Sequence, residues 1–380
     1  MCNIYGRPKV LFVSNTLSHI ISFHLPYLKW FKDRGFEVHV MTNTLGKYTD
    51  ICCDKLYDIG MVRSPFNPIN LLALFRAKKI IKRENYEIIH CHTPMGGVIG
   101  RLASNGAKKS RSKIFYTAHG FHFYTGAPII NWIIYYNIEK FLSHYTDCII
   151  TINNEDFERA KKRFQTNRTT IRYISGIGVD SLKFKPTDIE TKNKIKSLLG
   201  YEGKFVLFYA AEFIERKNHV FLIECIVKLN KLIPNIKMVF AGNGKLYNLM
   251  MEKARKLCIS QSIDFLGFRT DVPQLLQMCD ALVSSSKQEG FPINLVEGMM
   301  SGVPIIASKI RGHNDIIAKN GTDGYLFDLN DQEEFCSYVY ELYTSSDKYN
   351  TIIKNSLIKS GQYDLNNSIR QMNAIYNEYL

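Results

Sequence analysis

The sequence of 380 residues has no apolar run long enough to cross a membrane. A spanning helix needs about 20 consecutive apolar residues. The first apolar run of the sequence covers only Val10 to Val13. That run is also too short for the core of a secretory signal peptide. We therefore expect a cytoplasmic protein. Fixed-period repeats and low-complexity tracts are also lacking, which argues against a solenoid and against a disordered chain.

The sequence also lacks the spacings of several well-known sites. Its nine cysteines are scattered without a Cys-x-x-Cys pair, so neither a zinc site nor a disulfide framework is expected. Gly242 and Gly244 form a Gly-x-Gly pair after a predicted strand, but the third glycine of a dinucleotide-binding motif is missing. This absence argues against a dehydrogenase.

Positive charge is concentrated in the first half of the chain. Residues 1–180 contain 25 Lys and Arg against 13 Asp and Glu, a net charge of +12, whereas residues 181–380 have a net charge of +2. Such an excess attracts anionic lipid, a lipid diphosphate or nucleic acid, although simple solubility explains it too. The positive residues gather in two clusters: Arg76, Lys78, Lys79, Lys82 and Arg83, and Lys108, Lys109, Arg111 and Lys113.

The first of these clusters adjoins a strongly apolar stretch. Leu71, Leu72, Leu74 and Phe75 precede or flank the charges of Arg76 and its neighbours. This pattern predicts either a peripheral membrane helix or an ordinary surface helix packed on its sheet.

Short apolar runs alternate with longer helical patterns, which is typical of parallel sheets built from strand-helix-strand units. The alternation occurs twice, and 380 residues with 46% hydrophobic content suit two domains. The first series of predicted strands is Lys9–Val13, Val38–Thr42, Ile88–His90, Ile114–Thr117 and Cys148–Thr151. The second is Lys204–Tyr209, Met238–Ala241, Ile263–Leu266, Ala281–Ser284 and Pro304–Ala307.

A passage rich in glycine and proline, from Gly176 to Pro186, separates the two series and reads as a linker. We expect a Rossmann-like domain over residues 1–185 and a second Rossmann-like domain over residues 186–362. Residues 363–380 should form a terminal helix that packs back on the first domain. Ligands of open parallel sheets bind beyond the carboxyl ends of the strands, so the active cleft should lie between the domains.

The most informative stretch runs from Ser284 to Pro304, where a strand ends, a loop turns and a helix begins. Free backbone N–H groups near Ile293, Asn294 and Leu295 would form an anion site suited to a diphosphate. Glu289 on the loop could accept hydrogen bonds from sugar hydroxyls, and Glu297 on the helix could accept them from a ribose diol.

This stretch resembles the Glu-x7-Glu signature of glycosyltransferase family 4, the retaining enzymes of the GT-B fold. The resemblance extends over nearly the whole chain and points to bacterial enzymes that build capsule, exopolysaccharide or O-antigen units. It implies an α/β fold of the GT-B type, with two Rossmann-like parallel-sheet domains that face each other across a cleft: an acceptor-binding domain over residues 1–185 and a nucleotide-sugar-binding domain over residues 186–362. It also implies no metal and no other cofactor, in agreement with the absence of an Asp-x-Asp motif.

The resemblance further implies transfer of a hexosyl or N-acetylhexosaminyl group from a UDP-sugar to a polyprenyl-diphosphate-linked glycan acceptor. The partners expected are these two substrates and the anionic inner face of the cytoplasmic membrane, with no nucleic acid. Two alternatives stay open: another GT-B enzyme, such as a sugar-nucleotide epimerase or a glycogen-type synthase, and a basic nucleic-acid-binding protein.

The family motifs imply a role for each matching position. The catalytic residues implied are Glu289, His119, Arg216 and Lys217. The donor-binding residues implied are Glu297, Phe291, Ile293, Asn294, Leu295, Gly267, Phe268, Arg269 and Gly312. The acceptor residues expected are Ser18, His19, His24, His92 and His122, although Ser18 could instead cap a helix. Many family members have Arg where Glu212 stands, so fewer groups here would neutralise the phosphates.

Overall fold

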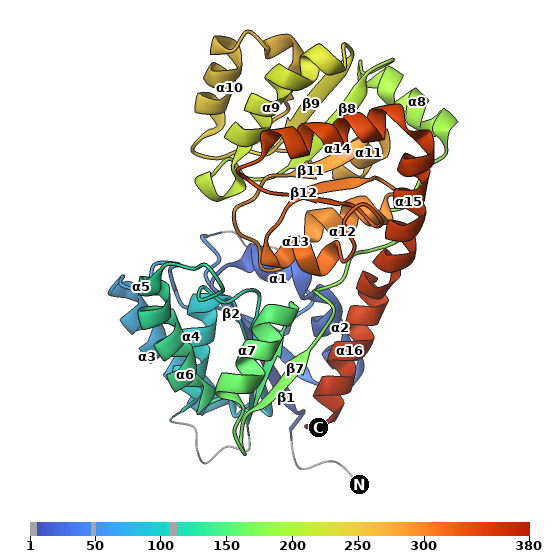
Figure 1. Ribbon diagram of the computed structural model, residues 1–380. Coiled ribbons are helices and arrows are strands. Elements are labelled where there is room, and N and C mark those ends of the chain that lie inside the picture. The colour runs from blue at the N-terminus through green and yellow to red at the C-terminus, as the bar shows by residue number, and fades with distance from the viewer. Residues whose placement is uncertain (1–5, 47–50, 106–111) are drawn as a thin grey trace. The chain divides into compact units, whose positions relative to one another are not determined.

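The computed structural model describes residues 6–46, 51–105 and 112–380, so the predicted basic residues Lys108, Lys109 and Arg111 lie outside the described residues. The chain forms two compact units. The N-terminal unit contains residues 1–177 and 368–380, and the C-terminal unit contains residues 178–367. Each unit is a parallel β-sheet with helices on both faces (Figure 1). The predicted α/β architecture is confirmed.

The N-terminal unit has a seven-stranded sheet in the order β3-β2-β1-β4-β5-β6-β7, with every neighbouring pair parallel. Its strands are β1 Lys9–Val13, β2 Glu37–Thr42, β3 Lys55–Asp58, β4 Ile88–His92, β5 Lys113–Ala118, β6 Cys148–Thr151 and β7 Thr170–Tyr173. Its helices are α1 Leu17–Phe23, α2 Leu25–Asp33, α3 Ile69–Glu84, α4 Pro94–Ser104, α5 Ile129–Asn131, the π-helix η1 Trp132–Tyr136, α6 Asn137–Ser143, α7 Asn154–Phe164 and α16 Leu365–Asn377.

Helices cover both faces of this sheet because its central strands are apolar on both sides. Leu11 and Val13 of β1 pack with α3, α4 and α7 in one buried cluster. Phe12, which points the opposite way, packs against Phe31 of α2 at 5.9 Å between ring centroids. The C-terminal helix α16 completes this second face, where its Tyr376 lies 4.8 Å from the Phe31 ring (Figure 1).

The C-terminal unit has a six-stranded parallel sheet in the order β10-β9-β8-β11-β12-β13. Its strands are β8 Phe205–Ala210, β9 Ile236–Ala241, β10 Ile263–Phe265, β11 Ala281–Ser284, β12 Ile305–Ser308 and β13 Tyr325–Phe327. Its helical elements are α8 Ile189–Leu198, η2 Glu215–Lys217, α9 His219–Leu232, α10 Tyr247–Lys256, η3 Ser260–Ser262, α11 Val272–Met278, α12 Ile293–Met300, α13 Arg311–Ile316, α14 Gln332–Thr344, α15 Ser346–Ser360 and η4 Gly361–Tyr363.

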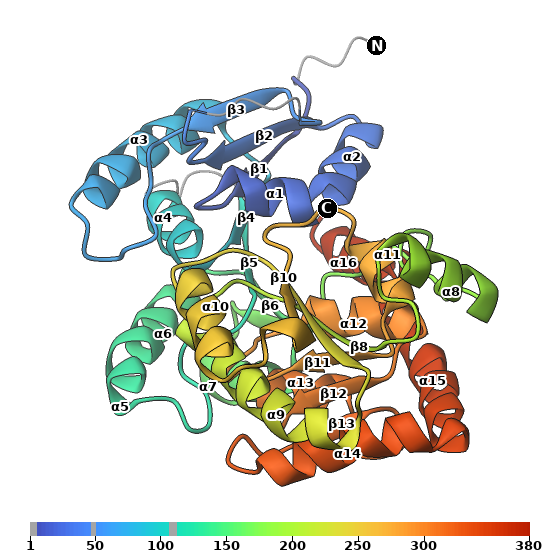
Figure 2. The same cartoon turned by 90° about the horizontal axis from the view of Figure 1, so that it is seen from above.

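Two buried clusters lie on opposite faces of this second sheet. One contains residues of α9, α10 and α14, and the other contains residues of α11 and α12 (Figure 2). Successive residues of β8 enter different clusters, Leu207 the first and Phe208 the second. Successive side chains of a strand point to opposite faces of the sheet, so one apolar strand contributes to the cores on both faces.

The chain passes between the units at residues 177 and 178 and returns at residues 367 and 368. The outgoing and returning segments pair within the C-terminal unit, where the Val179 N–H donates to the Tyr363 carbonyl at 2.9 Å and the Leu365 N–H donates to the Val179 carbonyl at 2.9 Å. The chain therefore leaves the N-terminal unit before the domain boundary that the sequence predicted between residues 185 and 186. Residues 368–380 belong to the N-terminal unit.

Three strands were missed by the sequence reading, namely β3, β7 and β13. Each is an edge strand of its sheet. An edge strand has a neighbour on one side only and need not be apolar; Lys55 and Asp58, at the two ends of β3, are exposed. The apolar pattern is therefore weak in β3 and β7, whereas β13 is apolar and buried but only three residues long.

Tyr376 should be a main contributor to the docking of α16. It is fully buried, and its hydroxyl lies 2.6 Å from Nδ1 of His90. Tyr376→Ala should lower the free energy of unfolding by about 3–5 kcal/mol, because it leaves a large cavity. Trp30 and Trp132 are the two tryptophans of the chain and both lie in the N-terminal unit, so urea unfolding followed by tryptophan fluorescence reports on this unit.

Glu378→Ala is the matched control on the same terminal segment. Glu378 forms an exposed ion pair with Arg172 at 2.6 Å, and such pairs contribute about 0–1 kcal/mol. Equal losses in the two variants would contradict a packing role for Tyr376.

Candidate functional site

The predicted catalytic residues of the C-terminal unit lie where its sheet order changes direction. β8 lies between β9 and β11, so the segments that follow β8 and β11 leave the same sheet edge in opposite directions. Such a switch point opens a crevice at the carboxyl ends of the strands. Arg216 and Lys217 follow β8 in η2, and Glu289 follows β11.

These three residues form one ion-paired cluster. Lys217 Nζ donates to one carboxylate oxygen of Glu289 at 2.5 Å, and Arg216 Nη1 donates to the other at 3.1 Å. Arg216 also donates to the Gln288 carbonyl at 2.9 Å. Glu289 is only 8% exposed, whereas the Arg216 side chain is 40% exposed. The cluster has a net charge of +1, with its guanidinium turned partly to solvent, which suits it to bind a diphosphate.

Burial alone would raise the pKa of Glu289, but the charges of Lys217 and Arg216 outweigh it and hold the pKa below its usual value. Glu289 is therefore ionised at neutral pH, and it accepts hydrogen bonds through both oxygens.

Buried hydroxyl groups fix the position of Lys217. The Ser285 hydroxyl donates to the Asn218 carbonyl at 2.8 Å, and the Tyr209 hydroxyl donates to the Lys217 carbonyl at 3.1 Å. The Lys287 N–H donates to the Arg216 carbonyl at 2.8 Å and joins the two loops directly. The three consecutive serines from Ser284 to Ser286 are buried and pack beneath the backbone of this cluster. The sequence analysis assigned these serines no role.

The loop after β12 supports the backbone of Glu289. Gly312 packs so closely that a Cβ atom there would lie 2.9 Å from the Glu289 carbonyl oxygen. His313 is fully buried, and burial lowers its pKa to about 4. Its Nδ1–H donates to the Ser308 carbonyl at 2.7 Å. His313 thus serves as a packing residue of this loop.

The start of α12 differs in part from the expected anion site. The sequence predicted free N–H groups at Ile293 and Leu295, but these two groups donate to the carbonyls of Phe291 at 3.1 Å and Pro292 at 3.0 Å. The physical reason is a tight first turn, in which local bonds satisfy donors that an ideal helix leaves open. The donor-binding roles of these residues and of Asn294 stay predictions.

Glu297, one turn into α12, is in a different state from Glu289. Burial raises the pKa of Glu297 to about 7, and the more distant positive charge of Lys183 lowers it only in part. A carboxyl group that titrates near neutrality can both donate and accept a hydrogen bond, which suits contact with a diol.

The segment Gly267–Arg269 follows β10. The Gly267 carbonyl accepts from the Gly242 N–H at 2.7 Å, the Phe268 side chain is exposed, and Arg269 forms a two-point ion pair with Asp271. A Cβ atom at Gly242 would lie 2.0 Å from the Ala211 carbonyl oxygen. The Gly-x-Gly pair that the sequence set aside therefore allows the loops after β8 and β9 to pack together.

The N-terminal unit brings four predicted residues into one cluster, which we call the histidine group: His19, His24, His92 and His119. One ring nitrogen of each of the four histidines lies within 4.8 Å of those of the other three. His92 ends β4, His119 follows β5, and His19 lies on α1 after β1, so the group forms at the switch point between β1 and β4. The Nε2 atoms of His19 and His119 are 3.2 Å apart.

Burial keeps the histidine group neutral. It lowers the pKa of His19 to about 4 and holds the pKa values of His24, His92 and His119 well below the usual value, with further lowering from neighbouring histidines.

Two residues beside this group were missed by sequence reasoning. His90 packs against His92 at 4.0 Å between ring centroids, and its nitrogens contact Tyr376 and Thr117. The spacing His90-x-His92 could have revealed His90, because residues two positions apart in a strand lie on the same face of the sheet. Thr93 has a positive φ of 63°, an uncommon conformation for a β-branched residue, directly after His92.

His122 and Ser18 are not part of the histidine group. The His122 ring packs against Tyr135 at 4.8 Å between centroids. Ser18 is exposed within α1, where the N-cap position is Thr16, so the capping alternative for Ser18 is wrong. The assigned roles of both residues stay predictions.

Comparison with known proteins gives the family. A family model described as Glycosyl transferases group 1 matches residues 190–357, and one described as Glycosyl transferase 4-like matches residues 9–153. EpsD of Bacillus subtilis (strain 168), provisionally named a glycosyltransferase, is 39% identical over 98% of this chain and 97% of its own. The chain belongs to the family 4 glycosyltransferases. The predicted enzyme class is thereby confirmed.

This glycosyltransferase is also similar to an Escherichia coli protein named UDP-Gal:alpha-D-GlcNAc-diphosphoundecaprenol alpha-1,3-galactosyltransferase, with 29% identity over 84% of this chain and 83% of that protein. Among solved structures, Anabaena HepE in complex with UDP and glucose matches with a TM-score of 0.78. The match covers 98% of this chain and 100% of HepE at 19% identity, and it supports the fold. Within the described ranges, none of the helices of this glycosyltransferase has the length and apolar character that a bilayer crossing requires.

The raised pKa of Glu297 predicts a pH-dependent stability. Between the usual pKa of 4.5 and the folded value of about 7, the unfolded chain releases the proton that the folded chain retains. The contribution of Glu297 to stability therefore falls as pH rises through this window. Relative to Glu297→Gln, wild type should lose about 2 kcal/mol between pH 5 and pH 8. Urea unfolding followed by far-ultraviolet circular dichroism measures this difference.

Glu289→Gln is the control of opposite sign. The pKa of Glu289 is lowered, so its stabilising contribution is present above the usual pKa and is lost only in more acidic solution. The difference between this variant and wild type should stay nearly constant from pH 5 to pH 8. A constant difference for Glu297→Gln as well would refute the neutral state of Glu297.

Proposed function

We propose that this glycosyltransferase moves a hexosyl or N-acetylhexosaminyl group from a UDP-sugar to a polyprenyl-diphosphate-linked glycan acceptor, with retention of the anomeric configuration, in bacterial surface polysaccharide synthesis. The observation that carries the proposal is the cluster of Glu289, Arg216 and Lys217 at the edge of the second sheet. It combines an ionised carboxylate, suited to sugar hydroxyls, with two cations suited to a leaving diphosphate.

The relatives support the choice of substrates. The E. coli relative is named for a UDP-galactose donor and an undecaprenol diphosphate-linked acceptor. A Campylobacter jejuni relative, 25% identical over 94% of this chain, is also named for a diphospho-undecaprenol acceptor. HepE was solved with UDP. A uridine nucleotide donor and a lipid diphosphate acceptor are therefore the first substrates to test.

The cluster suits a mechanism without a protein nucleophile. The acceptor hydroxyl attacks the anomeric carbon on the face from which the diphosphate departs, and the leaving phosphate oxygen takes the hydroxyl proton. Arg216 and Lys217 stabilise the charge that develops on the diphosphate. Glu289 holds Arg216 and Lys217 in place, and it orients the donor sugar by accepting hydrogen bonds from the sugar hydroxyls. Because one face serves both bonds, the product keeps the donor configuration.

Glu289→Gln should lower the turnover number roughly 100-fold, because it removes the charge that positions both cations. The assay measures transfer from a panel of UDP-, GDP- and ADP-sugars to a polyprenyl diphosphate-linked N-acetylhexosamine, and nuclear magnetic resonance of the product gives its anomeric configuration. Retention of configuration is expected.

Glu215→Gln is the matched control, because Glu215 lies in the same segment but pairs with Lys245 and is exposed. Its turnover number should equal that of wild type. An inverted product would refute retention, transfer from other nucleotide sugars alone would refute the uridine donor, and full activity of Glu289→Gln would remove this residue from the mechanism.

We further propose that α3 binds the surface of an anionic membrane. The α3 patch consists of the exposed apolar residues Ile69, Leu71, Leu72 and Phe75. Leu74 instead packs against the core, where α3 is anchored by the small residues Ala73 and Ala77. The next turns of the helix carry five exposed positive residues: Arg76, Lys78, Lys79, Lys82 and Arg83. Exposed apolar side chains next to positive charge are the pattern of an interfacial helix.

The double substitution Leu72→Ser and Phe75→Ser should reduce binding to anionic liposomes roughly tenfold, because each side chain contributes apolar area to the interface. Flotation at low salt measures the bound fraction. Leu198→Ser is the control, since Leu198 is 76% exposed on α8 of the C-terminal unit. Equal flotation of all three proteins, or no flotation of wild type, would contradict membrane binding through α3.

A further inference from the structure

The helical segment from Ile129 to Ser143, formed by α5, η1 and α6, has an exposed face that is mainly apolar. Ile129, Ile133 and Phe141 are 78%, 59% and 54% exposed, and they follow one another at intervals close to one and two turns. Ile130 beside them is 52% exposed. We call these four residues the isoleucine face. A surface helix normally turns polar residues to solvent, so an outward apolar face of this kind indicates a site of interaction.

The opposite side of the segment is held firmly within the N-terminal unit. Trp132, Tyr135 and Tyr136 pack against the buried cluster that contains α3, α4 and α7. On α6, the Glu139 carboxylate accepts two hydrogen bonds from the buried Arg101 guanidinium of α4, at 2.8 and 3.1 Å. The segment is therefore a fixed element whose aromatic residues point inward and whose isoleucines point outward.

The neighbouring helix α7 adds positive charge beside this face. A hollow between η1 and α7 is lined by Trp132 and by charged residues of α7: Glu155, Glu158, Arg159, Lys161, Lys162 and Arg163. Glu155 pairs with Arg159 at 2.8 Å. Lys161, Lys162 and Arg163 are exposed, and none of the three has a carboxylate partner in the part of the chain that the structure describes. These three cations are therefore available to bind anions.

We propose that the isoleucine face binds the surface of an anionic membrane, with Lys161, Lys162 and Arg163 in contact with the lipid phosphates. The inference rests on the proposed action of this glycosyltransferase on a lipid-linked acceptor. Exposed apolar side chains next to unpaired positive charge are the pattern of a segment that lies in the membrane interface. A two-fold contact between copies of the chain would bring like cations together, so the charge favours anionic lipid over a second copy.

The isoleucine face would act together with the α3 patch. Helix α4 packs against both α3 and α6, so the two apolar surfaces belong to helices on either side of α4 (Figure 2). Two contact elements on one rigid unit bind a surface more tightly than either does alone, because the second contact forms at a high effective concentration.

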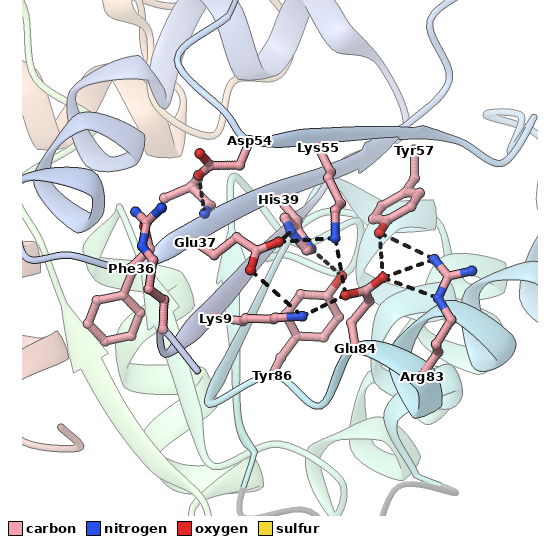
Figure 3. A network of polar contacts seen from close by, with 12 residues as sticks. Lys9, Phe36, Glu37, His39, Asp54, Lys55, Tyr57, Arg83, Glu84 and Tyr86 are labelled. Atoms are coloured by element: carbon pink, nitrogen blue, oxygen red, sulfur yellow. Dashed lines mark hydrogen bonds and ion pairs between the residues drawn. The ribbon is translucent and has the colours of Figure 1, made fainter. Parts of the chain in front are cut away.

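Helix α3 alone provides less free charge than its sequence suggests. Glu84, its last residue, pairs with Arg83 at 3.0 Å, with Lys9 at 2.7 Å and with Lys55 at 3.5 Å (Figure 3). The charge of Arg83 is therefore partly compensated within the protein, and the end of α3 is fixed to β1 and β3. The unpaired cations of α7 supply further charge for contact with lipid phosphates.

Flotation with liposomes that contain phosphatidylglycerol tests the isoleucine face while α3 stays intact. The double substitution Ile130→Ser and Ile133→Ser should weaken binding roughly tenfold, because it removes apolar area from the interface. The double substitution Lys161→Gln and Lys162→Gln should weaken binding at least fivefold at low salt. The matched controls are Leu198→Ser and Lys194→Gln, two exposed positions on α8 of the C-terminal unit, and both should bind as wild type does.

The variant Ile133→Trp reports contact with the bilayer directly. Lipids with brominated acyl chains quench the fluorescence of a tryptophan that enters the apolar layer. Quenching of Ile133→Trp should exceed that of wild type, whereas Leu198→Trp should show no added quenching. This measurement remains decisive even if a serine variant fails to fold.

Several results would overturn the inference. One is equal binding of wild type and the double serine variant at Ile130 and Ile133, even where substitutions in α3 do weaken binding. Another is the absence of added quenching in Ile133→Trp. A wild-type dimer that dissociates in the double serine variant, measured by analytical ultracentrifugation, would assign the face to a second copy instead. None of these measurements uses a donor or an acceptor, so their failure is distinct from a failure of the transfer assay.

Discussion

Parallel pairing of the strands is the constraint on which both sets of functional residues depend. In a parallel sheet all carboxyl ends lie at one edge, so residues far apart in the sequence meet there without any direct connection. His19 and His119 are 100 residues apart and Lys217 and Glu289 are 72 residues apart, yet each pair is in contact. In each unit the contact forms at the switch point, beside β1 in one sheet and beside β8 in the other. Any change that shifted the register of these strands would separate both pairs.

The two units compensate their buried polar side chains in different ways. In the C-terminal unit, the negative charge of Glu289 is compensated by two positive charges and held by hydrogen bonds. In the N-terminal unit, burial keeps the imidazoles neutral, so no counter-charge is needed, but each ring must still place a donor and an acceptor. The first arrangement is complete within the chain. The second is incomplete at His24 and His92, because among the described residues neither ring nitrogen of either histidine has a hydrogen-bond partner.

Much of this could be predicted from the sequence because the central strands of both sheets are buried on both faces and read as apolar runs. The residues that follow such strands, among them His119, Arg216 and Glu289, could therefore be placed at the sheet edge. The edge strands β3, β7 and β13 were not predicted: β3 has the exposed residues Lys55 and Asp58 at its ends, and β13 is apolar but only three residues long. The contacts themselves could not be predicted either. That Ser285 secures the Asn218 carbonyl, or that Gly312 packs on Glu289, depends on distances between loops that no local pattern encodes.

The protonation states of the two signature glutamates show most clearly what sequence spacing leaves undetermined. Glu289 and Glu297 are the same type of residue eight positions apart, and their spacing carries no information about their protonation states. Lys217 and Arg216 contact Glu289 and lower its pKa, whereas Glu297 has only a more distant positive charge against its burial, and its pKa rises to about 7. Pairs of carboxyl groups whose environments separate their pKa values are how one fold assigns different tasks to the same side chain. The difference between the two pKa values therefore arises from the packing of η2 against the loop after β11, which places Lys217 and Arg216 beside Glu289, and from the burial of Glu297, and not from the motif itself.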